Sequence, residues 1–259
     1  MPKSIFITGG ASGIGRATAI LFAKAGWRVA LADIDAAGLA ATRALLPASA
    51  EAYILDVRDR PGWLAALDAF TAPDGGRLEV LFNNAGIGTG GTLADTGFDT
   101  IDRTIAINLV GVLNGAKIGH AYLARTPGAC LLNTASASAL YGSAGLATYS
   151  ATKFAVRGLT EALDIEWARD GIKVRAIVPG FIETPLLDGR VDGGNRTIRE
   201  TVRASGLELT PVGAVAKAAW DAVHGARVHT YVGRTAHLMA LAARVAPALL
   251  RRRMRRAFS

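Results

Sequence analysis

The sequence predicts a single α/β domain built on a doubly wound parallel sheet, and three observations support that fold class. Short segments rich in β-forming residues alternate with longer segments of helical periodicity, which is the pattern of βαβ units. Strand-like runs such as LEVLF and ACLLNT are continuously apolar, as expected for strands covered by helices on both faces. With 259 residues, 51% hydrophobic and 19% charged, the chain can bury a large core, which excludes general disorder.

Seven segments have the length and composition of strands, so we expect a seven-stranded sheet. No internal repeat or low-complexity linker divides them, which favours one domain over two. In chain order the expected strands are Ser4–Thr8, Arg28–Ala32, Ala52–Leu55, Leu78–Asn83, Ala129–Thr134, Lys173–Val178 and Thr230–Val232.

Helices are expected between the strands and after the last one, where apolar residues recur at helical spacing. The polar, glycine-bearing stretch Asp188–Asn195 interrupts this pattern and predicts a mobile loop. The expected helices cover residues 14–25, 36–46, 60–70, 97–124, 147–169, 184–204, 211–223 and 236–256.

The positive charge of the chain is concentrated at its C-terminal end. The formal net charge is +8, but residues 234–259 contain seven arginines and no acid, and the other residues carry 22 basic against 21 acidic side chains. We therefore expect a domain over residues 1–233 and a basic helical extension over 234–259. Because the domain has no excess of basic residues, the composition predicts no nucleic-acid binding.

Other compositional signals exclude several classes of site and location. The lone Cys130 rules out a disulfide framework and any Cys-rich zinc site, and a reducing cytoplasm fits best. Four histidines follow no metal-ligand spacing, so no metal is expected. The apolar runs Ile5–Ile7 and Leu238–Leu250 are too short for an export signal and a membrane span respectively.

A glycine-rich turn follows the first strand, where Gly9, Gly13 and Gly15 precede a helical pattern. Glycines permit positive φ and leave room for a pyrophosphate, which backbone N–H groups at a helix N-terminus can bind. The spacing differs from the usual G-x-G-x-x-G fingerprint, so a purely structural tight turn is the alternative.

Asp33 favours the dinucleotide interpretation, because an acid at the end of the second strand can bind both hydroxyls of an adenosine ribose and repel a 2′-phosphate. The alternative is that Asp33 caps the helix beginning near Ala36. Arg16 points the other way, since a basic residue beside the loop can hold a 2′-phosphate. We expect NAD, with NADP as the alternative.

Tyr149 and Lys153 stand four residues apart at the start of a helical pattern and so project from one face. A phenol has a pKa near 10, and a nearby ammonium group lowers it toward a value useful for acid–base work. The same spacing also occurs by chance on ordinary amphipathic helices.

Taken together, residues 4–232 resemble the classical short-chain dehydrogenase/reductase family. The family's TGxxxGxG, NNAG and YxxxK motifs match Thr8–Gly15, Asn83–Gly86 and Tyr149–Lys153. Further matches are Asn108 in INLVG, Ser136 thirteen residues before the tyrosine, Asp56-Val57, and Pro179-Gly180 followed by Thr184.

The resemblance implies a Rossmann-type fold and an oxidoreductase that transfers hydride between a nicotinamide cofactor and a substrate. It implies a catalytic set of Asn108, Ser136, Tyr149 and Lys153, although Ala135 replaces a serine found in many members and leaves Ser138 as a weaker candidate. The implied cofactor-binding residues are Gly9, Ser12, Gly13, Ile14, Gly15, Asp33, Asp56, Val57, Asn83, Ala85, Gly86, Tyr149, Lys153, Pro179, Gly180, Ile182 and Thr184.

The segments expected to line the substrate pocket carry few charges, which favours a lipophilic secondary alcohol or ketone over a sugar phosphate or acyl thioester. These segments are Gly88–Gly91, Ala137–Leu146 and Phe181–Leu207, with Leu140, Tyr141, Leu146, Phe181, Leu186 and Leu187 as candidates. A non-catalytic, cofactor-sensing protein recruited to membranes is the alternative from another functional class, and the intact catalytic set argues against it.

A homo-oligomer, a dimer or a tetramer, is expected from the apolar helix 147–169 and from the habit of the family. Its apolar residues at helical spacing are Ala155, Leu159, Ala162, Leu163 and Trp167.

The C-terminal extension reads as an amphipathic helix. We expect its apolar face to pack on the same chain or on a neighbouring subunit beside the substrate entrance. Peripheral contact with an anionic membrane is the less favoured alternative. Its apolar face would contain Leu238, Leu241, Ala242, Val245 and Leu249, and its basic face Arg244, Arg251 and Arg255.

Overall fold

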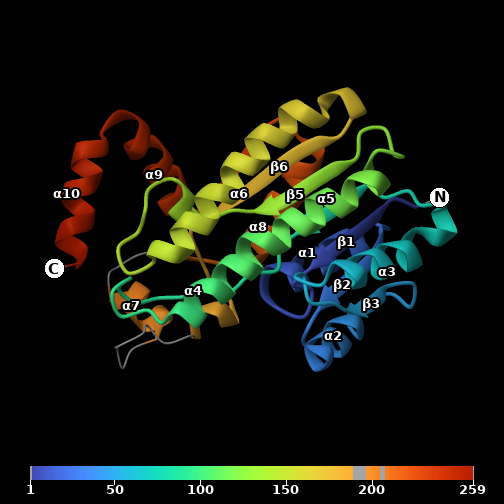
Figure 1. The fold of residues 1–259 in the computed structure, drawn as a ribbon, viewed down its shortest axis with the longest axis horizontal. Coiled ribbons are helices and arrows are strands. Elements are labelled where there is room, and N and C mark those ends of the chain that lie inside the picture. The colour runs from blue at the N-terminus through green and yellow to red at the C-terminus, as the bar shows by residue number, and fades with distance from the viewer. Residues whose placement is uncertain (1, 189–196, 205–207, 259) are drawn as a thin grey trace.

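The computed structural model describes residues 2–188, 197–204 and 208–258 and contains the expected seven-stranded parallel sheet (Figure 1). The strand order is β3-β2-β1-β4-β5-β6-β9, so the chain winds outward in both directions from the centre. The strands are β1 (Ser4–Thr8), β2 (Arg28–Asp33), β3 (Glu51–Ile54), β4 (Val80–Asn83), β5 (Cys130–Thr134), β6 (Lys173–Pro179) and β9 (His229–Val232).

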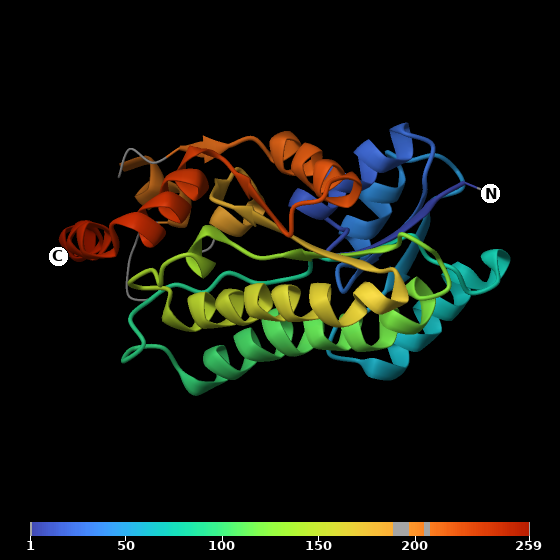
Figure 2. The same cartoon turned by 90° about the horizontal axis from the view of Figure 1, so that it is seen from above.

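Helices cover both faces of the sheet because successive strand residues point to opposite sides. On β1, Ile5 and Ile7 face one core and Phe6 faces the other. The first core contains α1 (Gly13–Lys24), α2 (Ala36–Arg43) and α8 (Val212–His224). The second contains α3 (Arg60–Thr71), α5 (Gly111–Leu123) and α6 (Ala147–Glu166). Figure 2 shows the two layers on either side of the sheet.

Three of the expected helices are divided in the structure. The expected helix 97–124 consists of α4 (Phe98–Ile105), a π-helical segment (Ala106–Val110) and α5. The π-helical segment places Asn108 in the protein interior, a local widening that periodicity does not reveal.

In the expected helix 184–204 the structure has a 3₁₀ turn (Pro185–Asp188) and α7 (Ile198–Ala204). The loop expected over Asp188–Asn195 lies outside the described residues from position 189 onward. A short parallel pair, β7 (Phe181–Ile182) and β8 (Leu209–Thr210), lies beside the main sheet.

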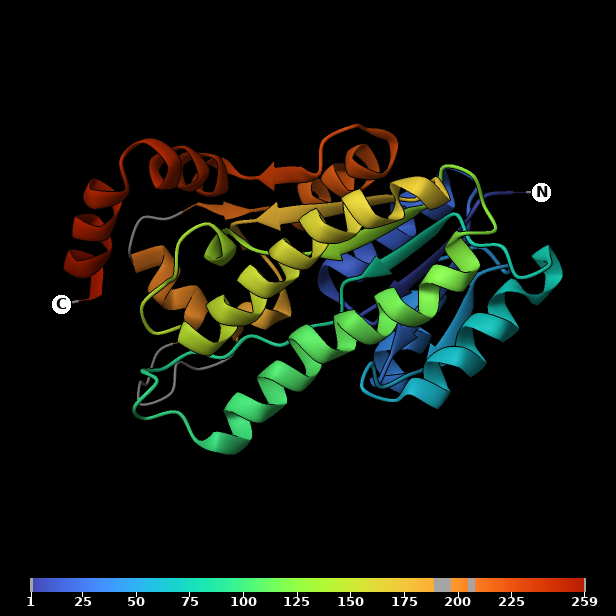
Figure 3. The same cartoon turned by 45° about the horizontal axis from the view of Figure 1, so that its top comes forward.

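The C-terminal extension forms two helices where one was expected, α9 (Arg234–Val245) and α10 (Pro247–Phe258). Pro247 causes the break, because a proline inside a helix lacks the N–H for the backbone hydrogen bond and forces Ala246 out of helical geometry. In Figures 1 and 3 the two helices meet at a sharp corner at the end of the molecule away from the N-terminus. Within the described residues no helix is long and apolar enough to cross a membrane.

A chain of buried polar side chains joins the central strands to the helices of one face. Asn83 Nδ2 donates to Asn133 Oδ1 at 3.1 Å and to the Val112 carbonyl at 3.2 Å, and Asn133 Nδ2 donates to Thr160 Oγ1 at 3.0 Å. These bonds link β4 and β5 to α5 and α6. Because the groups are removed from water, each depends on its partner for satisfaction.

We predict that Asn133→Ala lowers the free energy of unfolding by about 2–4 kcal/mol, because it opens a cavity and removes the buried hydrogen bonds that Asn133 forms with Asn83 and Thr160. Thr160→Val keeps the shape of its side chain and should cost about 1–2 kcal/mol. Since both variants break the same hydrogen bond, the double variant should cost less than the two together, as measured by urea unfolding. Additive costs would show that the chain of bonds is not coupled.

Candidate active site

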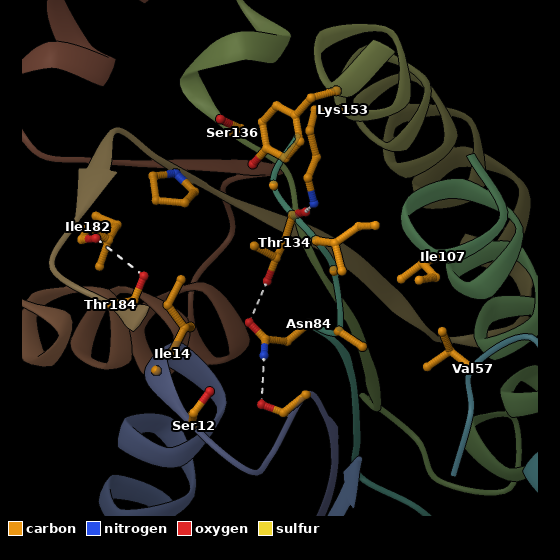
Figure 4. Close-up of a pocket in the computed structure, with 18 of the residues that line it drawn as sticks. Ser12, Ile14, Val57, Asn84, Ile107, Thr134, Ser136, Lys153, Ile182 and Thr184 are labelled. Atoms are coloured by element: carbon orange, nitrogen blue, oxygen red, sulfur yellow. Dashed lines mark hydrogen bonds between the residues drawn. The ribbon is translucent and has the colours of Figure 1, made fainter. Parts of the chain in front are cut away.

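A cavity of about 390 Å³ lies at the carboxyl edge of the sheet, where the strand order reverses between β1 and β4. Residues from the loop after β1, the ends of β2, β4, β5 and β6, and the start of α6 line it (Figure 4). In open parallel sheets this crevice is the usual place for a ligand, because the loops diverge there and leave space.

The glycine-rich loop owes its shape to close backbone contacts. Gly9 has φ of +68°, and a Cβ there would lie 2.9 Å from the Cα of Ala85. A Cβ on Gly15 would lie 2.1 Å from the carbonyl oxygen of Gly9. Gly15 therefore allows the loop to close and does not itself line the cavity, whereas Gly9, Ser12, Gly13 and Ile14 do. The N-terminus of α1 faces the cavity and is suited to bind a phosphate group.

Three polar side chains join the ends of β1, β4 and β5 beneath this loop. Thr8 Oγ1 accepts from the backbone N–H groups of Asn84 and Ala85, at 3.0 and 3.1 Å. Asn84 Nδ2 donates to the Thr8 carbonyl at 3.0 Å. Thr134 Oγ1 donates to Asn84 Oδ1 at 3.1 Å, a hydrogen bond drawn in Figure 4. These bonds set the width of the crevice.

Asn84, a residue absent from the expected site, lines the cavity, whereas the expected Asn83 does not. Asn83 belongs to the buried polar chain described above, on the other side of β4. The sequence could have indicated that only one of these two asparagines faces the cavity, because adjacent residues of a strand face opposite sides of the sheet.

Asp33 lies at the cavity end of β2, and its carboxylate accepts from the N–H groups of Ala11 and Asp35, both at 3.1 Å. It does not cap α2, because the N-cap of that helix is Asp35, whose Oδ1 accepts from the N–H of Gly38. The guanidinium of Arg16 is engaged within the protein, donating to Thr42 Oγ1 at 2.8 Å and to the Ala11 carbonyl at 2.5 Å.

Asp56 and Val57 line the cavity next to an unexpected neighbour, Arg58. The Arg58 guanidinium donates to both carboxylate oxygens of Asp56, and its backbone N–H donates to Oδ1 at 2.9 Å. These hydrogen bonds hold the pKa of Asp56 below its usual range. No spacing rule in the sequence indicated this pairing.

Tyr149, Lys153 and Ser136 converge on the cavity, as α6 begins beside the end of β5. Lys153 Nζ donates to the Thr134 carbonyl at 2.9 Å and lies 5.6 Å from the centre of the Tyr149 ring. In Figure 4 Ser136 and Lys153 lie on neighbouring elements at one end of the cavity. Ser138 also lines the cavity, but its hydroxyl lies 3.5 Å from that of Ser143, and its N–H donates to Ser136 Oγ.

Burial changes the acid–base properties of the tyrosine and the lysine in opposite directions, because it disfavours the charged form of each. It raises the pKa of Tyr149, which a hydrogen bond with Ser136 partly offsets. It lowers the pKa of Lys153 to about 8. The sequence predicted that Lys153 lowers the pKa of Tyr149, but in the chain by itself burial raises this pKa and only Ser136 opposes the rise.

Asn108 lies outside the cavity and fixes the backbone of Ile87, one of the residues that line it. Its Oδ1 accepts from the N–H of Ile87 at 2.8 Å, and its Nδ2 donates to the Ile87 carbonyl at 2.9 Å. A Cβ on Gly86 would lie 3.1 Å from Asn108 Oδ1 and 3.6 Å from Lys153 Nζ. Asn108 is buried outside the lining, so its side chain reaches the cavity only through Gly86 and Ile87.

The segment after β6 forms the remaining wall opposite the glycine loop. A Cβ on Gly13 would lie 3.3 Å from Thr184 Cγ2, which shows how closely the two segments approach. Thr184 Oγ1 donates to the Ile182 carbonyl at 3.3 Å (Figure 4). Among the expected residues from this segment, the cavity is lined by Pro179, Gly180, Phe181, Ile182, Thr184 and Leu187.

Only some of the other residues expected in the substrate pocket line the cavity. Leu146 lines the cavity, whereas Leu140 is buried in a hydrophobic cluster and Tyr141 lies away from the lining. The side chain of Leu186 lies outside the described part of the chain. Residues not expected from the sequence include Ile34, Arg58, Asn84, Ile87, Arg103, Ile107 and Thr134.

Comparison with known proteins agrees with this geometry. The family model described as short chain dehydrogenase matches residues 3–193. A 3-oxoacyl-[acyl-carrier-protein] reductase of Thermotoga maritima is 34% identical, over 83% of this chain and 85% of its own. A 3-alpha-(or 20-beta)-hydroxysteroid dehydrogenase of Mycobacterium bovis is 36% identical, over 72% of this chain and 71% of its own.

A solved structure supports the same relationship. The short-chain dehydrogenase/reductase from Burkholderia phymatum in complex with NAD superposes with a TM-score of 0.83 and 27% identity, covering 97% of this chain and 95% of its own. The chain therefore belongs to the short-chain dehydrogenase/reductase family of oxidoreductases.

Proposed function

We propose that the protein is an NAD(H)-dependent dehydrogenase or ketoreductase for a lipophilic secondary alcohol or ketone. The observation that carries the proposal is the convergence of the Tyr149 phenol, the Ser136 hydroxyl and the buried Lys153 ammonium group on one cavity. A phenol and an amine this close together form an acid–base pair for the oxygen of a carbonyl or an alcohol.

The residues of the chain manage the proton. A bound nicotinamide supplies the hydride chemistry. During alcohol oxidation the phenolate form of Tyr149 accepts the proton of the substrate hydroxyl. During ketone reduction the phenol form of Tyr149 donates its proton to the substrate oxygen. Ser136 donates a hydrogen bond to the same substrate oxygen and stabilises the negative charge that develops there. A protonated Lys153 favours the phenolate and binds the nicotinamide ribose.

We propose that Asn108 passes the proton onward through a water molecule. Its two hydrogen bonds to Ile87 use one amide hydrogen and one lone pair of the oxygen. The side chain is buried behind Gly86 and Ile87, so it acts on the cavity through these two residues.

NAD rather than NADP is the proposed cofactor because Asp33 places a carboxylate where the adenosine ribose would lie. The glycine loop, with its exposed amides, suits the pyrophosphate, so the residues present fit a dinucleotide. The carboxylate would repel a 2′-phosphate. Arg16, the basis for NADP, already donates to Thr42 and Ala11, which weakens that alternative.

The proposed substrate is apolar because the cavity near Tyr149 is walled by Leu146, Phe181 and Leu187. A hydroxysteroid dehydrogenase among the relatives acts on a substrate of that type. Another relative reduces 3-oxoacyl groups on acyl carrier protein, so an acyl thioester is the competing substrate class.

We also propose a homo-oligomer that associates through the outer face of α6. Leu163 and Trp167, which the sequence suggested for this face, are buried within the chain. Phe154 and Ile165 are exposed instead, at 42% and 79%, and Gly158 and Ala162 lie between them at helical spacing. A stripe of small residues between two large apolar ones permits close packing of a second helix.

We predict that Tyr149→Phe reduces kcat by about 10²- to 10⁴-fold, because the variant lacks the group that exchanges the proton. NADH binding, followed by fluorescence, should change little. Tyr141→Phe serves as the matched control, since that tyrosine lies nearby but outside the cavity lining. Near-normal turnover of the Tyr149 variant would disprove the acid–base assignment.

Asp33→Asn should lower kcat/KM with NAD by about tenfold to a hundredfold, because it removes one charged hydrogen bond to the ribose. The same change should raise kcat/KM with NADP by relieving repulsion. Arg16→Ala should leave the ratio between the cofactors unchanged. If the Arg16 variant alone abolished activity with NADP, the alternative cofactor assignment would be correct.

Replacing both Phe154 and Ile165 with lysine should shift sedimentation velocity from an oligomer to the 26.9 kDa monomer, since the charges would be buried in the proposed interface. The control places lysine at Ile54 and Leu64, which are exposed elsewhere. A wild-type protein that is monomeric at micromolar concentration would refute the proposal.

A further inference from the structure

The helices α9 and α10 present an apolar surface that the chain does not cover. The inner face of α9 packs into a hydrophobic cluster through Ala236, Met239 and Ala240. On its outer face Leu238, Leu241 and Val245 are 61%, 60% and 67% exposed. These three residues have the spacing i, i+3, i+7 and therefore form one stripe along the helix.

The stripe continues to the corner between the helices. Leu249, in the first turn of α10, is 68% exposed, whereas its neighbour Leu250 is buried. We call Leu238, Leu241, Val245 and Leu249 the tail patch. Contiguous exposed apolar side chains on a protein surface are typical of sites that bind another protein or a membrane. The sequence predicted that this face packs on the same chain or on a neighbouring subunit. Packing on the same chain is wrong for the described residues, and packing on a neighbouring subunit is an outcome that the test below distinguishes.

Basic side chains accompany the tail patch. Arg234 and Arg244 are exposed on α9, and Arg251, Arg252 and Arg253 are exposed on α10. Residues 234–259 contain no acid. In the part of the chain that the structure describes, Arg244 and the three consecutive arginines of α10 form no salt bridge. The positive charge is therefore available to an external partner.

We propose that α9 and α10 dock in the plane of an anionic lipid bilayer. The tail patch enters the boundary between headgroups and acyl chains, and the arginines bind lipid phosphates. Apolar and basic residues together on short helices are what such a surface attracts. Each helix has 12 residues, about 18 Å, which suits a helix lying on a membrane and not one crossing it.

A second copy of the chain is a poorer occupant for the same surface. Two tail segments would bring together many positive charges and no negative one. The rest of the chain has nearly balanced charge and offers no acidic excess to compensate them. An anionic bilayer satisfies both the charge and the apolar patch.

Docking would also orient the molecule. The helix α9 starts where β9 ends, at the carboxyl edge of the sheet, and it packs against the turn Ala137–Ala139 directly after Ser136. The cavity lies at that same edge. The bilayer would therefore lie on the cavity side of the protein. The docking proposal itself does not depend on the reaction proposed above.

The test is co-sedimentation of the full-length protein with vesicles at physiological salt. Vesicles of phosphatidylcholine containing about a third phosphatidylglycerol should bind the protein, and pure phosphatidylcholine vesicles should bind it weakly. Added salt should weaken the binding, since screening reduces the attraction between arginine and phosphate. Equal binding to both kinds of vesicle would overturn the electrostatic part of the proposal.

Charge variants test the basic residues separately. Replacing Arg251, Arg252 and Arg253 with glutamine should weaken binding by about fivefold for each residue, which corresponds to about 1 kcal/mol per charge near an anionic surface. The matched control replaces Lys24, Arg125 and Arg169, which are exposed at the opposite edge of the sheet. An equal loss in the control would mean that net charge alone attracts the vesicles, contrary to the proposal.

Apolar variants test the tail patch. Leu238→Ser with Leu241→Ser should also release the protein from anionic vesicles, whereas Leu45→Ser with Ile54→Ser, at exposed sites elsewhere, should not. Thermal unfolding by circular dichroism confirms that each variant is folded. If the Leu238 and Leu241 variant bound vesicles normally but lost an oligomer in sedimentation velocity, the occupant would be a second copy and the proposal would fail.

Discussion

The hydrogen bonds among Thr8, Asn84 and Thr134 are the constraint on which the site depends. At the reversal of strand order the chain leaves β1 and β4 in opposite directions, which opens the crevice. Without cross-links the loops at its two sides could separate. The bonds hold the glycine loop against the end of β4, and the Thr134 carbonyl in turn holds Lys153. The glycine loop and the part of the cavity around Lys153 are thereby held at a fixed separation.

Residues that form the site and residues that support it are neighbours in the sequence but lie on different sides of the backbone. Asn84 faces the cavity, and Asn83 faces a buried chain of amides and hydroxyls. Gly13 lines the cavity, and Gly15 lets the loop close. Asn108 acts through Ile87 and Gly86. Substitutions at the supporting positions should therefore affect stability and geometry together, because their partners have no access to water.

The degree of burial determines both the acid–base properties of the groups in the cavity and the properties of the exposed C-terminal helices. Desolvation raises the pKa of Tyr149 and lowers that of Lys153 in the cavity. At the other extreme, the tail patch and its arginines remain exposed, because only the opposite face of α9 packs into the hydrophobic cluster of Ala236, Met239 and Ala240. The same chain thus buries Ser136 and Lys153 at the cavity and presents its uncompensated charge to the surroundings.

The sequence alone determined the order of the strands along the chain, the two-sided helix layers and the positions of the glycine loop, Asp33, Ser136, Tyr149 and Lys153. These features rest on periodicity and on local motifs, which short stretches of sequence record directly. Only the tertiary structure decided that Asp33 is not a helix cap, that Arg16 is engaged with Thr42, and that the face containing Phe154 and Ile165 is exposed. Each of those outcomes depends on which distant segment fills the space beside a side chain, and residue spacing along the chain does not contain that information.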